Sequence, residues 1–395
     1  MPGIYIHIPF CKKKCAYCGF YSVPFLKSGG DYAERFDGYA KLLEREAELQ
    51  SVAVKDTAFD TVYFGGGTPS LLGRENFERV FSALHKNFKI DGGAEITVEG
   101  NPSDFVDIKR LLFLRDEGVN RVSVGIQTMN GGTLKKIGRA QTPADNLAAL
   151  RRVAEIFDNF SADIMLGLPG ENGDDLERTL ATVSSFGVKH ISAYALKIEE
   201  NTPLCAAAVA GRVNLPDDDT ASGYYGLVLK ELKKRGIERY EVSNFAKRGY
   251  RSRHNLNYWK RGEYLGLGAA AHSFMNGERF ENPPDLDAYA AAVNAESRAA
   301  ENTERPFAVS AGLLAAGNRR KISADDALFE KIMLGLRLSD GISVSETEKE
   351  FGINFREKYA AALKKLDRCF SFKGENIAVK GKYFYVLNSV LTEFL

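Results

Sequence analysis

Short β-branched runs alternate with longer amphipathic segments over the first two-thirds of this 395-residue chain. Such alternation predicts βα units around a parallel sheet, which curls into a barrel or an open partial barrel. The expected fold is therefore an α/β partial barrel of about six units. The expected strands are residues 4–8, 61–64, 94–99, 121–126, 162–166 and 190–196, with 239–243 as an extra one. The expected helices are residues 32–51, 75–86, 105–117, 145–157, 174–186 and 220–234.

The carboxyl ends of these expected strands carry the least ordinary residues of the chain. A cysteine-rich stretch at 11–18 follows the first strand, and a Gly-Gly-Gly-Thr-Pro turn at 65–69 follows the second. Glu99 ends the third strand, Gln127 closes the fourth, and Leu-Pro-Gly at 168–170 closes the fifth. In parallel barrels the functional groups gather on the loops after the strands. We therefore expect one site at this end.

The cysteine-rich stretch reads Cys-Lys-Lys-Lys-Cys-Ala-Tyr-Cys, with cysteines at Cys11, Cys15 and Cys18. Cysteine thiolates hold iron–sulfur clusters, commonly four to a cluster, so a trio leaves one iron open to a small molecule. One alternative is structural zinc, which usually has four Cys or His ligands. The other is a disulfide scaffold, which fits poorly because the long chain has five cysteines and starts without a signal-peptide pattern.

The spacing of the three cysteines, with an aromatic residue just before the last, resembles that of the radical S-adenosylmethionine (SAM) superfamily. The resemblance implies a 4Fe-4S cluster whose fourth iron is chelated by SAM. It also implies that the reduced cluster splits SAM into methionine and a 5′-deoxyadenosyl radical. By the same resemblance, the residues expected to contact SAM are Tyr5, Tyr17, Gly66, Gly67, Thr68, Glu99, Gln127, Arg139, Asp163 and Ala195.

Elementary chemistry is compatible with several of these assignments. Glycine at 66 and 67 lets the backbone approach a ligand without a Cβ, and carboxylates such as Glu99 and Asp163 suit an ammonium group or hydroxyls. Arg139 suits a carboxylate. Each also has a structural alternative: Glu99 as a helix cap, Asp163 as a buried and satisfied carboxylate, and Arg139 as a surface cation.

A second motif lies near residue 254, where the chain reads His-Asn-Leu-Asn-Tyr-Trp and contains its only tryptophan. Histidine is a common haem iron ligand, and flat aromatic side chains can flank a tetrapyrrole. Ordinary aromatic packing is the alternative that the residues leave open. The candidate haem-binding residues are His254, Asn255, Tyr258 and Trp259.

This motif resembles the HemW family of radical SAM haem chaperones, as do the stretches at 5–11, 163–170 and 201–203. The resemblance runs almost end to end and implies a protein that binds haem and delivers it to haem-requiring acceptor proteins. The family is related to the oxygen-independent coproporphyrinogen III dehydrogenase, which is the alternative function. Whether the chain cleaves SAM is left open, and coproporphyrinogen oxidation is not expected.

Three features separate the chain from the dehydrogenase. The dehydrogenase has a fourth cysteine after Cys-Gly, whereas this chain reads Cys18-Gly19-Phe20. It also has a long N-terminal extension, and it lacks the His-Asn-x-x-Tyr-Trp motif. Two residues depart from the chaperone pattern. Gly19 replaces the usual aspartate, and Gln141 replaces a frequent histidine.

The last part of the chain predicts a small helical domain. A boundary is expected after about Pro306, with the polar stretch 317–321 as a linker. Apolar residues at helical spacing follow from Leu328 to Leu336, and a helix is expected over 355–366. A hairpin is expected from 377–379 and 383–387. The predicted domains are a radical SAM partial barrel at 1–245, a haem-motif and connecting region at 246–317, and a helical domain with a β-wing at 318–395.

Charge and hydropathy restrict the partners. Lys plus Arg number 53 and Asp plus Glu number 52, so the balance predicts no nucleic-acid partner. No apolar run approaches the roughly 18 residues of a membrane-spanning helix, and a cytoplasmic protein is expected. The expected partners are haem, haem-accepting proteins and a reducing electron donor, with a homodimer as an open alternative.

Overall fold

A computed structural model describes residues 1–25, 32–301 and 319–394. A twelve-stranded sheet forms its largest part, and six neighbouring strands run parallel in the order β1-β4-β5-β6-β7-β8. These six strands confirm the α/β partial barrel. Their bounds are β1 Gly3–Ile8, β4 Ala58–Gly66, β5 Lys89–Gly100, β6 Arg121–Gln127, β7 Phe160–Leu166 and β8 His190–Ala195.

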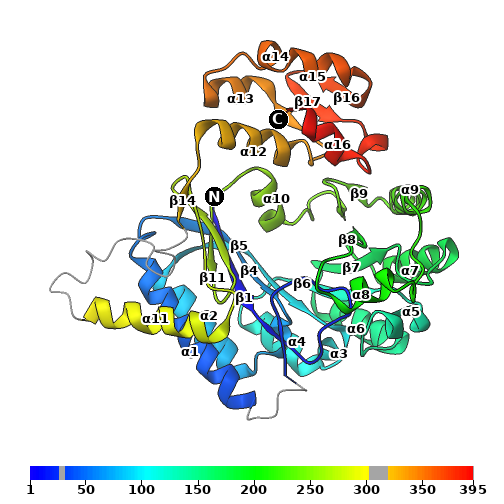
Figure 1. The fold of residues 1–395 in the computed structure, drawn as a ribbon. Coiled ribbons are helices and arrows are strands. Elements are labelled where there is room, and N and C mark those ends of the chain that lie inside the picture. The colour runs from blue at the N-terminus through cyan, green and yellow to red at the C-terminus, as the bar shows by residue number, and fades with distance from the viewer. Residues whose placement is uncertain (26–31, 302–318, 395) are drawn as a thin grey trace.

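The sheet curves without closing, because β1 and β8 are not paired with each other. Helices lie along its outer face (Figure 1). The alternation of residues along β1 explains why helices cover this face. Ile4, Ile6 and Ile8 point outward and are buried in the main core, whereas Tyr5 and His7 face the barrel interior beside β4. The helices of this layer are α1 Tyr32–Ser51, α2 Arg74–Asn87, α3 Pro102–Phe105, α4 Ile108–Asp116, α5 Gly131–Lys136, α6 Pro143–Ile156, α7 Gly173–Ser185, α8 Pro203–Val209 and α9 Asp218–Lys234.

The sheet continues past residue 245. Strand β11 pairs in parallel with β1 through Gly3 and Tyr264, and antiparallel strands extend the edge beyond it. The sheet therefore crosses the predicted boundary between 245 and 246, and the division into three domains stays a prediction. The elements are β11 Tyr264–Leu267, β12 His272–Met275, β13 Glu278–Glu281, α11 Leu286–Glu301 and β14 Arg320–Lys321.

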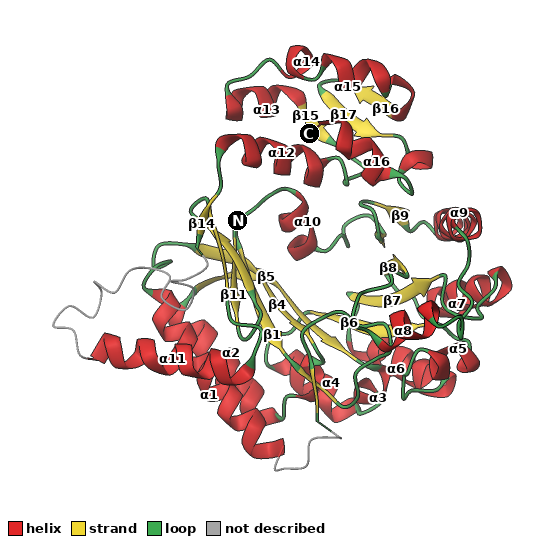
Figure 2. Cartoon of the chain, viewed as in Figure 1, coloured by secondary structure: helices red, strands yellow, loops and turns green. Residues whose placement is uncertain are grey.

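Helix α10, Arg253–Trp259, covers the amino-terminal end of the parallel strands, and the C-terminal domain lies over it (Figure 1). Arg261, just after α10, pairs with Glu330 of α12 at 2.9 Å. The opposite, carboxyl end of the barrel is therefore the one that this domain leaves uncovered. The C-terminal elements are α12 Ala324–Gly335, β15 Ile342–Ser343, α13 Val344–Phe351, α14 Phe355–Lys358, α15 Ala360–Lys365, β16 Phe370–Lys373, β17 Asn376–Val379 and α16 Leu387–Leu391 (Figure 2).

Two expectations in the barrel are wrong in detail. The helix predicted over 105–117 is α4 but begins only at Ile108, because the Asp107 side chain accepts the N–H of Lys109 at 3.0 Å and caps it, whereas Phe105 ends the separate short helix α3. The strand predicted over 239–243 is a bend between β9, Glu238–Arg239, and β10, Asn244–Ala246. Within that bend, the Glu241 side chain accepts the N–H of Ser243.

Two expectations in the C-terminal domain are also wrong. The hairpin is formed by β16 and β17, because Gly374, at φ 57°, makes the turn. After Gly381 the chain enters a short 3-10 helix instead of a strand. The helix predicted over 355–366 breaks at Tyr359. Residues 302–318, with Pro306 and the first two residues of the predicted linker, lie outside the described residues. The linker prediction is wrong for Arg320 and Lys321, which form β14 and pair with β13. No helix in the described ranges is both long and apolar enough to span a membrane.

Candidate functional site

A cavity of about 590 Å³ opens at the carboxyl end of the parallel strands. This volume lies within the range of small-molecule sites. Its walls are formed by residues 11–20, called the cysteine loop below, by the glycine turn at 65–69 after β4, and by the ends of β5 to β8. Its lining includes Cys11, Lys13, Lys14, Cys15, Tyr17, Cys18, Phe20, Gly66, Gly67, Thr68, Glu99, Gln127, Arg139, Asp163, Met165, Tyr194, Ala195 and Lys197.

All three cysteines face this cavity as free thiols. Cys11 Sγ lies 3.4 Å from Thr68 Oγ1, which ties the loop to the glycine turn. Burial raises the pKa of Cys11, and the neighbouring Cys15 and Cys18 raise it further. Because burial and neighbouring thiolates disfavour ionisation of Cys11, a cationic centre at the site would favour the thiolate form. In the described part of the chain, no group of three His, Cys, Asp or Glu side chains is arranged to hold a metal ion. The fit to an iron–sulfur cluster therefore rests on the chemistry of the donors.

The glycine turn packs directly against the start of the cysteine loop. Gly66 has φ 107°, a conformation that favours glycine. The Gly67 N–H donates to the Ile8 carbonyl at 2.8 Å. A Cβ at Gly67 would lie 2.8 Å from the backbone oxygens of Ile8 and Phe10. The turn and the cysteine loop can therefore hold this spacing only with glycine at 67.

Replacing Gly67 with alanine is expected to lower the free energy of unfolding by about 1–3 kcal/mol, because backbone atoms must move to admit the methyl group. Chemical denaturation measures the change. Gly73→Ala is the matched control, since a Cβ there meets nothing within 4 Å. Its effect is expected within about 0.5 kcal/mol. Equal stabilities of the two variants would contradict the proposed contact.

Two carboxyl groups share the cavity wall. The Tyr63 hydroxyl donates to Glu99 Oε1 at 2.5 Å, and the Ser123 hydroxyl donates to both Asp163 oxygens at 3.0 and 3.1 Å. Burial raises the pKa of Glu99 to about 7, and the charge of Asp163 adds to the rise. Burial also raises the pKa of Asp163. Ionising both groups in one cavity is costly, so the pair favours a cationic ligand.

Arg139 supplies positive charge at the same cavity. Its guanidinium donates to Asn101 Oδ1 and to the Gly125 carbonyl. Burial would lower the pKa of Arg139, but Tyr17 and Cys15 raise it. Its Nε is buried and has no hydrogen-bond partner among the described residues. A donor of this kind suits a carboxylate.

Gln127 ends β6 with φ 67°, which is unusual for a residue other than glycine. The pairing of β6 with β7 shifts register between Val124 and Gln127. An irregularity of this kind re-aims a side chain. Gln127 lines the cavity as a result.

Nine of the ten residues assigned to SAM lie at this one cavity. The tenth, Tyr5, lies farther inside the barrel, where its hydroxyl bonds His7 Nδ1 at 3.1 Å and its ring stacks on Tyr63. The contacts to SAM stay a prediction. Residues that sequence reasoning missed include Tyr63 and Ser123. Strand alternation could have found both, since Tyr63 lies two residues before the glycine turn and Ser123 two residues after the start of β6.

The His-Asn-x-x-Tyr-Trp residues lie elsewhere. His254, Asn255, Tyr258 and Trp259 all belong to α10, at the amino-terminal end of the barrel. His254 is 1% exposed, and its ring nitrogens bond Thr61 Oγ1 at 2.8 Å and Tyr258 Oη at 2.9 Å. Burial lowers the pKa of His254 to about 3, so the imidazole is neutral. The structure thus separates this motif from the cavity, and its contact with haem stays a prediction.

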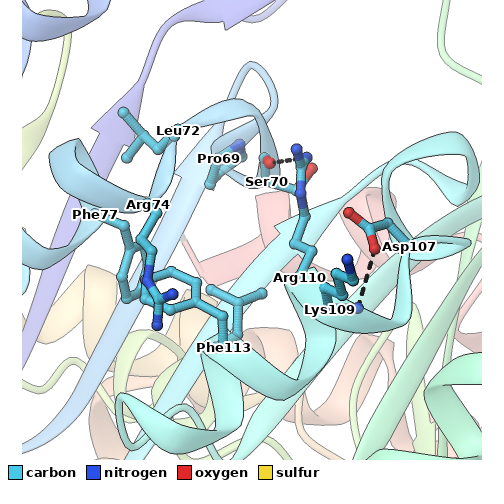
Figure 3. A pocket seen from close by; sticks show the side chains of 11 residues that line it. Pro69, Ser70, Leu72, Arg74, Phe77, Asp107, Lys109, Arg110 and Phe113 are labelled. Carbon is cyan, nitrogen blue, oxygen red and sulfur yellow. Dashed lines mark hydrogen bonds between the residues drawn. The ribbon is translucent and has the colours of Figure 1, made fainter.

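A smaller cavity of about 240 Å³ lies between the glycine turn and α4 (Figure 3). Arg110 points across it and donates to the Ser70 carbonyl. The Ser70 hydroxyl donates to Asp104 at 3.0 Å, and Asp104 pairs with Lys12 of the cysteine loop at 2.6 Å. These contacts fasten the glycine turn and the cysteine loop to α3 and α4. We therefore interpret the contacts around this smaller cavity as structural, because they hold two walls of the larger cavity in place.

Comparisons with known proteins agree with this geometry. The model of the radical SAM superfamily matches residues 5–183, and that of the HemN C-terminal domain matches residues 322–369. A protein of Bacillus subtilis named "Heme chaperone HemW" is 32% identical over 93% of this chain and 91% of its own length. A protein of the same name from Lactococcus lactis is 31% identical over 99% and 96%.

One solved structure has a similar fold along the whole chain. It is coproporphyrinogen III oxidase (HemN) from Escherichia coli, described as a radical SAM enzyme. The TM-score is 0.81 at 22% identity, and the match covers 100% of this chain and 90% of that one. At this identity the likeness shows a shared fold, including the C-terminal domain.

Proposed function

This chain belongs to the HemW family of radical SAM proteins, and from that premise we propose that it binds haem and delivers it to haem-requiring acceptor proteins. The observation that carries the proposal is similarity to relatives named haem chaperones over nearly the whole chain. The absence of a fourth cysteine in Cys18-Gly19-Phe20 also favours the chaperone. We propose a cytoplasmic location, a reducing electron donor as a partner, and a homodimer as the assembly to test.

The family implies a 4Fe-4S cluster and SAM. We propose that Cys11, Cys15 and Cys18 hold the cluster. When bound, the cluster and SAM would supply an open iron site and one-electron chemistry. The chain's own residues bind and orient the cofactors. The glycine turn presents backbone groups at 66–68, Glu99 and Asp163 offer oxygens to cationic or hydroxyl groups, and Arg139 offers a donor to a carboxylate.

SAM affinity is expected to rise as the pH increases through about 7. Glu99 has a pKa near 7 in this cavity, so it is largely protonated at lower pH and cannot pair with the ammonium group of SAM. Ionisation above that pH favours the cation by up to about tenfold in affinity. Burial and the charge of Asp163 raise the pKa of Glu99, whereas the hydrogen bond from Tyr63 and the charge of Arg121 lower it. Calorimetric titration across the pH range measures the effect.

The matched variant for this prediction is Glu99→Gln, which keeps the shape of the side chain and removes the titration. The SAM affinity of Glu99→Gln should be low and should not increase between acidic pH and about pH 7. At higher pH both proteins should lose affinity together, because the α-amino group of SAM itself titrates at about 8. An unchanged acid-side rise in Glu99→Gln would assign the titration to another group.

The function is tested on anaerobically reconstituted protein with SAM present. Haem titration followed by absorbance should show saturable binding, and transfer to an acceptor apoprotein should follow. A coproporphyrinogen III assay on the same sample, with a reductant, should yield no product. Product formation would establish the dehydrogenase instead, and absence of haem binding would overturn the chaperone proposal.

A further inference from the structure

The residues of α10 are poorly placed to receive haem. His254 is buried, both of its ring nitrogens are occupied, and its ring stacks 4.9 Å from that of Tyr63. The space around it is full, because even a Cβ on Gly3 would lie 2.9 Å from His254 Nδ1. The C-terminal domain covers this end of the barrel through the ion pair of Arg261 and Glu330. A flat macrocycle could reach the imidazole only after these contacts had broken.

The opposite end of the barrel offers exposed aromatic surface. Phe20 of the cysteine loop is 70% exposed, and Tyr194 at the end of β8 is 42% exposed. Both line the large cavity. Their two segments are in contact, since a Cβ on Gly19 would lie 3.0 Å from the Glu199 side chain. The cavity mouth, defined here by Phe20, Tyr194, Lys13, Lys14 and Lys197, is therefore built from both segments.

One patch of the cavity wall beside this mouth is apolar. Ile137, Met165 and Leu168 form a small buried cluster separate from the main core, with Tyr17 and Leu196 packed against it. Met165 and Tyr17 also line the cavity. An apolar wall next to exposed aromatic rings suits a large, flat, hydrophobic ligand.

Three lysines give the mouth a positive edge. Lys13, Lys14 and Lys197 are exposed and line the cavity. The Lys14 ammonium donates to the Phe20 carbonyl at 3.2 Å and so holds the loop that carries the aromatic ring. Lys197 pairs with Glu199, the acidic group at this edge, at 2.9 Å. Cations beside an apolar surface suit the two propionates of haem.

We propose that haem lies across the cavity mouth, with its ring on Phe20 and Tyr194 and its propionates toward Lys13 and Lys197. This inference rests on the proposed haem-binding function and assigns that function to a different surface from the His-Asn-x-x-Tyr-Trp helix. It places haem next to the cysteine loop, whereas α10 lies at the far end of the strands.

The test is haem titration of reconstituted, SAM-loaded protein, comparing matched substitutions at the two places. Phe20→Ser is expected to weaken haem binding by about tenfold through lost ring contact. Its control is Phe372→Ser, which removes another exposed phenylalanine, in the C-terminal domain. Lys13→Glu is compared with Lys260→Glu, an exposed position directly after α10. The two controls are expected to bind within about twofold of the parent protein.

A second ligand checks the propionate contact. Haem dimethyl ester lacks the two charges, so Lys13→Glu should weaken binding of haem and leave binding of the ester unchanged. Raising the salt concentration should weaken haem binding to the parent protein more than to Lys13→Glu. Failure of the parent protein to bind haem overturns the proposed function. Normal binding by Phe20→Ser and Lys13→Glu, with binding intact in the parent, overturns the proposed location alone.

Discussion

Cys15→Ala protein, reconstituted anaerobically with iron and sulfide, is expected to contain almost no 4Fe-4S cluster. Two remaining thiolates leave two irons without a protein ligand, where the family pattern leaves one. The loop itself should still fold, because backbone hydrogen bonds anchor it on both sides. The Ala16 N–H donates to the Ile137 carbonyl at 3.0 Å, and the Ala16 carbonyl accepts the Leu204 N–H at 2.8 Å.

Iron and sulfide content and the visible absorption of the cluster measure this outcome. Cys369→Ala is the matched control, since Cys369 is also a partly exposed free thiol but lies in the C-terminal domain. It should load as much iron as the parent protein. Full iron loading in Cys15→Ala would mean that another ligand takes part, and equal loss in both variants would point to a general folding defect.

His254→Ala is expected to lower the free energy of unfolding by about 2–4 kcal/mol. The substitution empties a buried space beside Tyr63 and leaves the hydroxyls of Thr61 and Tyr258 without their imidazole partner. The helix start should stay in place, because the backbone N–H of His254 and the hydroxyl of the N-cap residue Ser252 donate to the buried Glu95, and alanine at 254 keeps both bonds. This stability effect separates a structural histidine from an open iron ligand.

Urea denaturation of the apoprotein measures the effect. The control is His272→Ala, because that side chain is 67% exposed and pairs with Glu281 at the surface. Its effect is expected within about 0.5 kcal/mol. If His254→Ala were as stable as the parent protein but no longer bound haem, the haem site would have to be assigned to α10.

Much of the site could be predicted because its signals are local. The spacing of Cys11, Cys15 and Cys18 and the glycines at 66 and 67 are readable from a few neighbouring residues. Short β-branched runs between longer amphipathic segments located all six parallel strands, because β-branched side chains pack well on a pleated sheet. The unusual residues after these strands placed the site at the carboxyl end of the barrel.

Errors arose where local patterns allow more than one outcome. Gly374 and Gly381 both permit a turn, and it is Gly374, at φ 57°, that connects the paired strands β16 and β17. In the stretch 105–117, Phe105 belongs to the preceding helix α3, and the Asp107 side chain decides where α4 starts. Neither choice is visible in the spacing of apolar residues.

The sequence by itself determined the donor atoms and the order of the βα units, because residue type and short spacing suffice for both. Only the tertiary structure decided which distant residues meet. It joined Tyr63 to Glu99 and Lys12 to Asp104, and it buried His254 under the C-terminal domain. The physical reason is that burial and hydrogen-bond partners depend on contacts between segments far apart in the chain. An imidazole in a motif that resembles a haem-binding motif can therefore become a neutral, buried core group.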